Sequence, residues 1–478
     1  MSEIKTSRAD VIWNYIGTIV SMSSGFLLLP LLLRYLTADE LGLWYVYLAV
    51  SNLTQLFEFG FNPTFARNIV YCLSGAKSIK KRGAGELSST GEVDWHLFKS
   101  LMTTSKIIYA VIAVLALIVV STLGSLYISG ITSGMEGTGH WASWAVFCLS
   151  IFINLYFLYS MTFLRGVGDI AGENRSKTYA KIAQLVSSAV LLVFGFGLLG
   201  ASIGFLVNGL VMRVFAGYYY SKHADISLGI RSDNANVTRD DVRGVLAEVS
   251  SIAWRDGVVQ IALYASTQAT SIISSLFLGL AETGMYSVLL QLGTAVYNFA
   301  GAFVKSYYPM FQSSFAKHDV HSMLDIVKRG ISAYWMLCAF GAAGIILVIF
   351  PLLPIVKPGV EVSVPFFLFL TLYLSLLNHH SIFCNFIIGM NEIPYMKAYL
   401  FSAVLGVIAS AVLCGVFHLG AWGLVAGQAA SQLIYNNWKW PQYVMKKLGF
   451  GYFEALKIGC RDWLISGLGH FGKSKIGK

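Results

Sequence analysis

Long apolar runs separated by short polar segments make up almost the whole chain. A helix that crosses a bilayer needs about 20 apolar residues, and most of the runs reach that length. The runs do not alternate between apolar and polar residues as the strands of a membrane barrel do, so helices are the expected spanning structure. The pattern predicts an all-α membrane protein with twelve transmembrane helices, at residues 11–36, 41–66, 101–128, 141–164, 178–198, 201–221, 244–278, 284–308, 330–356, 364–388, 397–417 and 419–441.

The two halves of the chain resemble each other. Residues 36–44 (LTADELGLW) join the first two apolar runs, and residues 278–286 (LGLAETGMY) join another pair 242 residues later. A second echo, of residues 166–169 in residues 389–392, again precedes two apolar runs. Transporters are often built from such repeats around a binding site at the membrane midplane.

This repeat predicts two six-helix lobes, at 1–221 and 244–445. A polar segment at 222–243 is expected to be a flexible cytoplasmic linker. The tail at 446–478 places aromatic and apolar residues at helical spacing among Lys and Arg, which is typical of a helix lying at a membrane surface.

Composition and charge agree with this plan. The 478 residues are 56% hydrophobic and 12% charged, and mean hydropathy is +0.65, whereas soluble chains carry roughly 25% charged residues. Lys and Arg concentrate in alternate loops, and basic loops stay in the cytoplasm, so both termini are expected there. The net charge of +10 then reflects this topology and the anionic inner leaflet, and no nucleic-acid partner is expected. The loops expected outside contain Lys357 as their one basic residue: 37–40, 129–140, 199–200, 279–283, 357–363 and 418.

Several kinds of chemistry are not expected. The chain has no Walker A sequence, no H-E-x-x-H, no G-x-S-x-G and no Gly-rich dinucleotide motif, so an enzyme is not expected, and no cofactor is implied. The six cysteines have no metal-ligand spacing, so neither a metal site nor disulfides are expected.

Polar residues three or four positions apart form stripes along several predicted spans. The stripes are 256, 260, 264, 267, 271 and 274 in the seventh span and 287, 291, 294, 298, 301 and 305 in the eighth, with shorter ones in the first, second and last. Such stripes must face other helices or water, because facing lipid would be costly. Any single Ser, Thr or Asn is more simply explained as a contact between helices. Two full-length stripes at matching repeat positions favour a water-filled path, with Gln260, Gln291 and Asn298 as substrate-binding residues.

Charged residues lie toward the cytoplasmic ends of these spans. Snorkelling of long side chains to the interface would explain Arg67, Arg213 and Lys305. Alternatively, these three residues and Arg255 bind an anionic headgroup, because Arg matches phosphate oxygens with a planar fork and Lys supplies a point charge.

Two acidic residues and a histidine pair complete the candidates within the spans. Glu58 and Asp256 are candidates for ion coupling or for internal counter-ions. His379 and His380 lie in the tenth predicted span, where helix packing is the favoured interpretation and a proton relay is the alternative.

Three stretches of the chain carry a family resemblance: residues 30–44 (PLLLRYLTADELGLW), 58–68 (EFGFNPTFARN) and 254–257 (WRDG). They resemble the bacterial O-antigen and polysaccharide flippases of the Wzx type. These flippases belong to the multidrug/oligosaccharidyl-lipid/polysaccharide (MOP) exporter superfamily. The resemblance implies two six-helix lobes arranged as a V around a central cationic cavity. It further implies that an oligosaccharide on undecaprenyl pyrophosphate, an O-antigen or capsular repeat unit, moves to the outer leaflet of the inner membrane by alternating access.

The resemblance also implies partners. These are membrane lipid, a proton or sodium ion as in an antiporter, and a glycan polymerase with a chain-length regulator, as in lipopolysaccharide biosynthesis. Two other functions stay open. A cation-coupled multidrug exporter on the same scaffold should have mainly acidic residues in the first lobe's cavity, whereas basic ones dominate here. A polytopic glycan polymerase or ligase is disfavoured by the repeat and by outer loops almost free of Lys and Arg.

Overall fold

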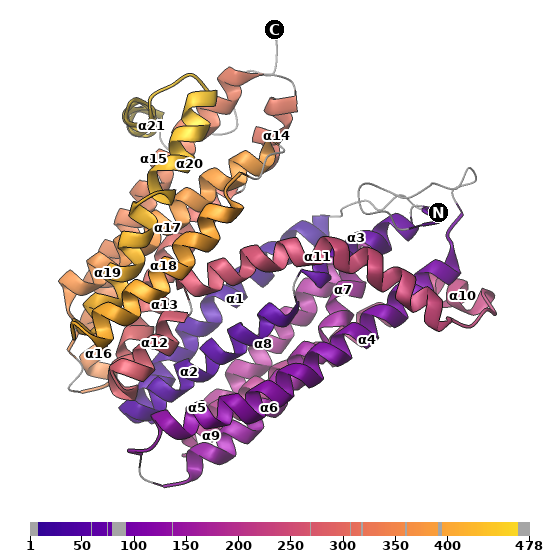
Figure 1. Ribbon diagram of the computed structural model, residues 1–478, viewed down its shortest axis with the longest axis horizontal. Helices are drawn as coiled ribbons and strands as arrows, with labels where there is room; N and C mark the ends of the chain where they lie inside the picture. The colour runs from indigo at the N-terminus through magenta and orange to yellow at the C-terminus, as the bar shows by residue number, and fades with distance from the viewer. Residues whose placement is uncertain are drawn as a thin grey trace. The chain divides into compact units, whose positions relative to one another are not determined.

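The structure is a computed structural model that describes residues 8–58, 60–73, 75–78, 92–135, 137–267, 269–305, 307–316, 319–358, 361–390 and 394–466. These residues form helices joined by short loops (Figure 1). The chain divides into two compact units, unit 1 (Met1–Tyr264) and unit 2 (Ala265–Lys478). The division falls inside one long helix, and the domain boundaries expected at 221, 243 and 445 stay predictions.

Unit 1 contains the helices α1 Arg8–Tyr35, α2 Ala38–Gln55, α3 Phe61–Leu73, α4 Trp95–Val119, α5 Ser125–Ile131, α6 Gly139–Tyr156, α7 Leu158–Gly166, α8 Ile170–Val193, α9 Gly197–Ser221, α10 Ala224–Ser232 and most of α11 Arg239–Thr267. Unit 2 contains α12 Ala269–Phe277, α13 Leu280–Lys305, α14 Tyr308–Ala316, α15 Val320–Gly344, α16 Phe350–Val356, α17 Val364–Gly389, α18 Met396–Gly415, α19 Gly420–Leu433, α20 Asn436–Lys447 and α21 Tyr452–Ser466.

Side-chain caps fix where several helices begin. Thr37 and Glu40 form a capping box at the start of α2, in which each side chain accepts the other residue's backbone N–H, at 3.2 and 3.0 Å. Asp94 caps α4 and Asp319 caps α15, each by accepting the N–H three residues later. Such caps satisfy N–H groups that the first helical turn leaves without partners.

The two units repeat one unusual arrangement. In unit 1, the 25 residues of α4 continue into a five-residue π-helical turn (η2, Val120–Gly124) and then into the seven residues of α5. In unit 2, α15, the π-helical turn η3 (Ile345–Ile349) and α16 have the same three lengths. The second arrangement begins 225 residues after the first. The repeat seen in the sequence therefore extends to backbone geometry.

Small residues allow close packing within each unit. In unit 1, α8 packs against α1 and α9, and α9 also packs against α6. A Cβ at Gly204 would meet the Ser188 hydroxyl across the α8–α9 contact. In unit 2, α18 packs on α19, where a Cβ at Gly427 would meet the backbone of Ser410. The sequence therefore uses glycine where these helices approach most closely.

Seven helical segments in the described part of the chain are long and apolar enough to cross a membrane: Trp95–Ile131, Gly139–Gly166, Gly197–Ser221, Leu280–Lys305, Val320–Val356, Val364–Ile388 and Met396–Gly415. They coincide with seven of the twelve predicted spans. Among the others, α2 is 18 residues long and starts with acidic residues, and α19 has only 14 residues. The helix α8 carries Glu173, Arg175, Lys177 and Lys181. The count of twelve stays a prediction.

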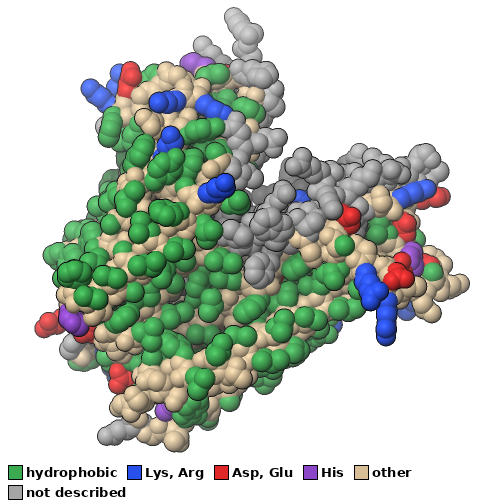
Figure 2. All heavy atoms as spheres, viewed as in Figure 1, with side chains coloured by type: hydrophobic (Ala, Val, Ile, Leu, Met, Phe, Trp, Pro, Cys, Tyr) green, Lys and Arg blue, Asp and Glu red, His purple; other side chains and the backbone are tan. Residues whose placement is uncertain are grey.

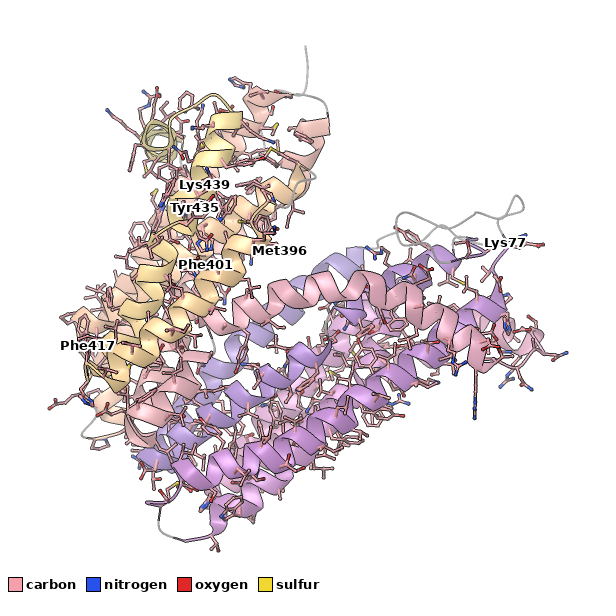
Figure 3. The ribbon with its side chains drawn as sticks, viewed as in Figure 1. Lys77, Met396, Phe401, Phe417, Tyr435 and Lys439 are labelled. Atoms are coloured by element: carbon pink, nitrogen blue, oxygen red, sulfur yellow. The ribbon has the colours of Figure 1, made fainter. Side chains whose placement is uncertain are left out.

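Large apolar side chains are exposed on these segments. Figure 2 shows apolar surface over both units. On unit 2, Phe401 in α18 is 69% exposed and Phe417, just beyond that helix, is 63% exposed (Figure 3). Lipid tails, rather than water, are the environment that such a surface suits.

Some predicted spans contain helix breaks that the hydropathy pattern did not show. The span at 41–66 is broken between α2 and α3, where Gly60 has a φ of +75°. The span at 141–164 is broken at Phe157, and the span at 419–441 at residues 434–435. Hydropathy averages over many residues, so it misses one irregular residue in an apolar run.

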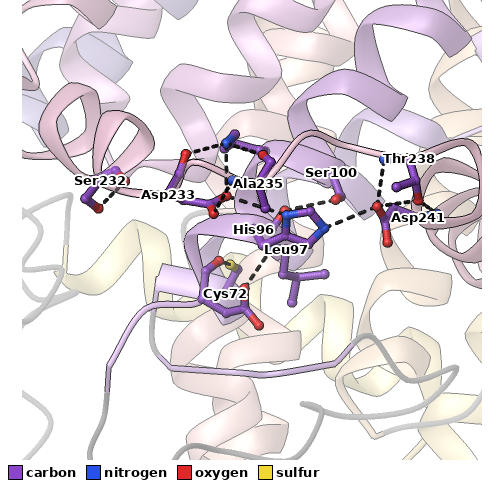
Figure 4. A network of polar contacts seen from close by, with 12 residues as sticks. Cys72, His96, Leu97, Ser100, Ser232, Asp233, Ala235, Thr238 and Asp241 are labelled. Atoms are coloured by element: carbon purple, nitrogen blue, oxygen red, sulfur yellow. Dashed lines mark hydrogen bonds and ion pairs between the residues drawn. The ribbon is translucent and has the colours of Figure 1, made fainter.

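Part of the segment expected to be a cytoplasmic linker, at 222–243, has regular structure, and its role as a linker stays a prediction. Residues 224–232 form α10, which packs on α4. Beyond it, the Lys99 ammonium donates to the Asp233 carboxylate at 2.9 Å and to the backbone carbonyl of Ala235 at 2.8 Å (Figure 4). The His96 ring lies between two carboxylates, 3.5 Å from Asp233 and 3.2 Å from Asp241. Lys99 and His96 of α4 therefore hold several polar groups of this segment.

Candidate functional site

A cation–aromatic cluster in unit 1 brings together four side chains from different parts of the chain: Lys106, Phe157, Tyr159 and Arg213. The Arg213 guanidinium on α9 lies 5.4 Å from the Phe157 ring centre and 6.0 Å from that of Tyr159. The Lys106 ammonium on α4 lies 5.9 Å from the Tyr159 ring centre. Tyr159 is therefore shared by two cations. Cation–π contacts of this kind are worth roughly 0.5–2 kcal/mol.

The break between α6 and α7 places the aromatic part of this cluster. Phe157 is the residue between the two helices, and its carbonyl accepts the Ser160 hydroxyl at 2.6 Å. Side chains two positions apart point away from each other in a regular helix, yet the rings of Phe157 and Tyr159 both reach Arg213. The break between α6 and α7 thus allows two aromatic residues that are close in sequence to contact the same guanidinium, that of Arg213.

Glu58 is held by hydrogen bonds in the same unit. It ends the short 3₁₀ turn Leu56–Glu58 (η1) after α2. Its Oε1 accepts the hydroxyl of Tyr109, on α4, at 3.0 Å and the backbone N–H of Asn62 at 3.1 Å. Tyr109 is fully buried. A carboxylate in an apolar bundle is stabilised by such donors, which fix its position as well.

A second charged cluster lies at the start of α8. Glu173 is buried, and its carboxylate accepts from Arg165 at 2.5 and 3.0 Å and from Lys177 at 2.5 Å. Burial raises the pKa of the Glu173 carboxyl, but Lys177 and Arg165 outweigh this effect and hold the pKa below its ordinary value. With one carboxylate for two cations, this cluster keeps a net positive charge.

Of the residues predicted to act in unit 1 whose side chains the structure describes, Arg213 alone lies in the cation–aromatic cluster. The Glu58 carboxylate accepts a hydrogen bond from Tyr109 and is not part of that cluster. Arg67 is exposed on α3 and has no ion-pair partner among the side chains that the structure describes. Arg255, Asp256 and Gln260 belong to the backbone of α11, but their side chains lie outside the described residues.

The predicted residues of unit 2 lie along α13. Lys305 is exposed in the last turn of this helix, and Gln291 and Asn298 are half-buried. The expected cavity shared by Arg67, Arg213, Arg255 and Lys305 stays a prediction.

The histidine pair of α17 is buried in unit 2. His379 Nε2 lies 2.9 Å from the hydroxyl of Tyr452, in α21, and His380 Nδ1 lies 2.8 Å from the side-chain oxygen of Asn437, in α20. The His379 ring also contacts Trp335, at 5.2 Å between ring centres. These contacts join α17 to two other helices, which agrees with the favoured helix-packing interpretation.

Sequence reasoning missed two cations inside predicted spans. Lys106 lies in the span predicted at 101–128 and belongs to the cation–aromatic cluster. Lys181 lies in the span predicted at 178–198, where its ammonium donates to the Gln184 side chain at 3.1 Å. Both were visible as isolated Lys residues in apolar runs, the same signal that identified Lys305.

Comparisons with known proteins fit this fold. A family of polysaccharide biosynthesis proteins matches residues 7–315. The membrane protein EpsK of Bacillus subtilis (strain 168) is 24% identical over 210 residues, which are 43% of this chain and 41% of EpsK. The match therefore spans less than half of EpsK.

Solved structures show the same fold over the greater part of the chain. An inward-facing multidrug resistance MATE family transporter of the MOP superfamily has a TM-score of 0.63 at 15% identity, covering 92% of this chain and 99% of that one. An outward-facing structure of such a transporter has a TM-score of 0.56 at 16% identity, covering 92% and 96%. A MOP superfamily transporter from Pyrococcus furiosus has a TM-score of 0.54 at 14% identity, covering 94% and 100%.

These findings confirm the resemblance to polysaccharide flippases of the Wzx type on which the sequence analysis relied. The family match covers more than half of the chain, and the shared fold is that of multi-pass membrane transporters. The chain therefore belongs to the polysaccharide biosynthesis protein family and has the fold of the MOP superfamily transporters.

Proposed function

We propose that this protein is a flippase that moves an undecaprenyl-pyrophosphate-linked oligosaccharide from the inner to the outer leaflet of the bacterial inner membrane by alternating access. The observation that carries the proposal is the cation–aromatic cluster of Lys106, Phe157, Tyr159 and Arg213 in a chain of the polysaccharide biosynthesis family. A pyrophosphate that leaves the inner leaflet loses hydration, and fixed cations replace the lost water.

The geometry of the cluster suits a phosphate ligand. A guanidinium lying over an aromatic ring keeps its N–H groups, which lie in its plane, available for phosphate oxygens. Arg213 is half-buried and Lys106 is exposed, so a ligand has access to both. Arg213 would supply a planar pair of donors, and Lys106 a point charge beside it.

Other residues take proposed roles around this cluster. Arg67, Arg255 and Lys305 would add positive charge, and Gln260, Gln291 and Asn298 would bind sugar hydroxyl groups. Glu58 and Asp256 would exchange the coupling ion, a proton or sodium. The Lys and Arg of alternate loops support cytoplasmic termini. A glycan polymerase and a chain-length regulator would use the flipped product, an O-antigen or capsular repeat unit.

The test measures export in a strain that depends on this protein for its surface glycan. Arg213→Ala should abolish surface glycan and leave the lipid-linked precursor in the inner leaflet, while the protein still reaches the membrane. Arg213→Lys should rescue only partly, because the planar fork is lost. The control is Arg231→Ala, which removes an exposed arginine on α10 outside the cluster. Wild-type export by Arg213→Ala would overturn the proposal.

A cation-coupled multidrug exporter is the second candidate, because the fold is shared with MATE family transporters over 92% of this chain. An exporter of this kind should protect cells from cationic drugs. We expect deletion of the protein to remove surface glycan and to leave drug sensitivity unchanged. Increased sensitivity with normal surface glycan would support the exporter instead.

A further inference from the structure

Unit 1 contains a cavity of about 610 Å³ that is separate from the cation–aromatic cluster. It lies where α2, α6 and α9 begin. Its lining includes Thr37, Asp39, Glu40, Gly139, Phe196 and Leu198.

The cavity offers hydrogen-bond donors from the backbone. The helices α6 and α9 both begin in its wall, and neither has a side-chain cap at its N-cap residue, Thr138 or Phe196. The first N–H groups of a helix have no partner within the helix. Backbone N–H groups of Gly139 and Leu198 are therefore available to a ligand at two places in the wall.

The same cavity offers acceptors and apolar surface. Asp39 and Glu40 supply carboxylates. One Glu40 oxygen accepts the Thr37 N–H at 3.0 Å and the other points toward Gly197, where a Cβ would come within 3.2 Å of it. Phe196 is 50% exposed beside these groups. Donors, acceptors and an aromatic face thus meet in a volume typical of small-molecule pockets, roughly 300–1,000 Å³.

This combination selects for a neutral, hydroxyl-rich ligand. Sugar hydroxyl groups donate to carboxylates and accept from N–H groups, and the C–H faces of a sugar ring pack on aromatic and aliphatic side chains. An anion is disfavoured because Asp39 and Glu40 are in the wall and no Lys or Arg is among the described lining residues. A metal ion is disfavoured because the described residues contain no group of three His, Cys, Asp or Glu that could hold one.

We propose that this cavity is a second carbohydrate site, specific for uncharged sugars, at the end of unit 1 expected to face outward. Its assignment to the transported glycan rests on the proposed function, whereas its sugar chemistry rests on its own lining. At this end, the carboxylates would repel the pyrophosphate while accepting sugar hydroxyls. The site would thus receive the sugars first and leave the pyrophosphate outside the cavity.

The test measures binding of two soluble sugars to the full chain in lipid nanodiscs. Lactose is the neutral probe, and 3′-sialyllactose is the same disaccharide with an added carboxylate-bearing sugar. A Cβ at Gly139 meets nothing within 4 Å, so Gly139→Phe can place its ring in the cavity without displacing another group. Gly130→Phe is the matched control, because Gly130 is equally open, is exposed on α5 and does not line the cavity.

We expect lactose to bind, Gly139→Phe to weaken its binding by about tenfold or more, and Gly130→Phe to leave it unchanged. Gly139→Ala, which fills less space, should have a smaller effect and guards against misfolding of the Phe variant. Sialyllactose should bind the wild type about tenfold more weakly than lactose. The double variant Asp39→Asn, Glu40→Gln should lose this discrimination while keeping the helix cap, since the introduced amide oxygen would still accept the Thr37 N–H.

Two results would overturn the inference: no lactose binding at millimolar concentration, or lactose binding that Gly139→Phe does not change. The export assay separates this inference from the proposed function. If lactose binds in the cavity but Arg213→Ala exports normally, the carbohydrate site stands and the flippase proposal fails. If Arg213→Ala abolishes export and lactose does not bind, the reverse holds.

Discussion

Tyr109 and Tyr334 occupy the same position in the two units, each 14 residues after the start of a 25-residue helix. Both side chains are fully buried, and both hydroxyls donate a hydrogen bond. Tyr109 donates to the carboxylate of Glu58, whereas Tyr334 donates to the backbone carbonyl of Ser375 at 2.7 Å. The buried tyrosine at this position therefore donates a hydrogen bond to a charged group in unit 1 and to a neutral group in unit 2.

Two neighbouring positions show the same difference. The residue that follows Glu58 by the 242-residue spacing of the first repeat is Ala300, which is 0% exposed. The residue 225 positions after Lys106 is Ile331, which is 1% exposed. The fold therefore forms in unit 2 without charges at these positions. Charge that the fold does not require, yet that lies in an apolar predicted span, indicates function.

We consider two separate variants in which Lys106 and Ile331 each receive the other's side chain. One of them, Ile331→Lys, should give the largest effect on stability. Ile331→Lys buries an unpaired charge and should destabilise the protein by several kcal/mol. Lys106→Ile removes an exposed charge and should leave stability nearly unchanged while lowering glycan export. Thermal unfolding followed by size-exclusion chromatography measures the first effect, and surface glycan the second. Equal losses of stability in the two variants would contradict the comparison.

Among the changes at matched positions of the two units, replacement of the Glu58 carboxylate should give the largest effect on transport. We expect Glu58→Gln to reduce glycan export by about tenfold or more, because the amide keeps the hydrogen bonds but removes the ionisable group. Ala300→Ser places a small polar group at the matching position of unit 2 and should export normally. Surface glycan, normalised to membrane protein, is the measurement. Normal export by Glu58→Gln would assign Glu58 a structural role.

Removal of each tyrosine hydroxyl should give smaller and unequal losses of stability. Tyr334→Phe leaves a buried carbonyl without one donor and should cost about 1 kcal/mol. Tyr109→Phe removes a donor from a carboxylate and should cost about 1.5–3 kcal/mol. Only the Tyr109 variant is expected to change export. Denaturation of both purified variants under the same conditions tests the order, and the opposite order would contradict it.

The smallest effect should appear at the segment that follows α10. His96 contacts Asp233 and Asp241, whereas His321, its counterpart 225 residues later, is 84% exposed beside Asp325. His96→Gln should increase amide hydrogen exchange in residues 233–241, and His321→Gln should leave the exchange around its own position nearly unchanged. Equal changes in the two variants would remove this difference between the units.

Acid should loosen the same segment. Hydrogen bonds from Lys99 and from the Ala235 N–H hold the pKa of Asp233 below its ordinary value of 3.8. A carboxyl with a lower pKa in the folded state stabilises when ionised, so its contribution is complete above that ordinary value and is lost as the pH falls through the folded value. Exchange in 233–241, corrected for intrinsic rates, should therefore increase only below about pH 4. An increase between pH 7 and pH 5 would require another titrating group.

The sequence predicted most of what depends on local pattern. Helical class and the positions of seven long spans followed from hydropathy, the repeat followed from two pairs of similar short segments, and the family resemblance followed from three short stretches. The break at Phe157 did not, because no Gly or Pro marks it. Gly60 and Pro63 did mark the break before α3, but the apolar residues around them concealed it.

The site was less accessible to sequence reasoning. Arg213 was identified as an isolated cation in an apolar run, but its aromatic partners come from a helix about fifty residues earlier and are two of many aromatic residues. Lys106 carried the same signal as Arg213 and was overlooked. The contacts of Lys99 with residues 233 and 235 join positions 134 and 136 residues apart, which no local pattern reveals.

The paired π-helical turns bear on the history of the chain. A π turn accommodates one more residue per hydrogen-bonded loop than an α-helix does, so the insertion of one residue into a helix can produce it. Both turns follow 25 residues of α-helix, yet they read VSTLG and IILVI and share no residue at any position. A single insertion in a half-length ancestor, copied when its gene duplicated, would account for both. The two units thus share this backbone irregularity although their side chains differ at every one of its positions.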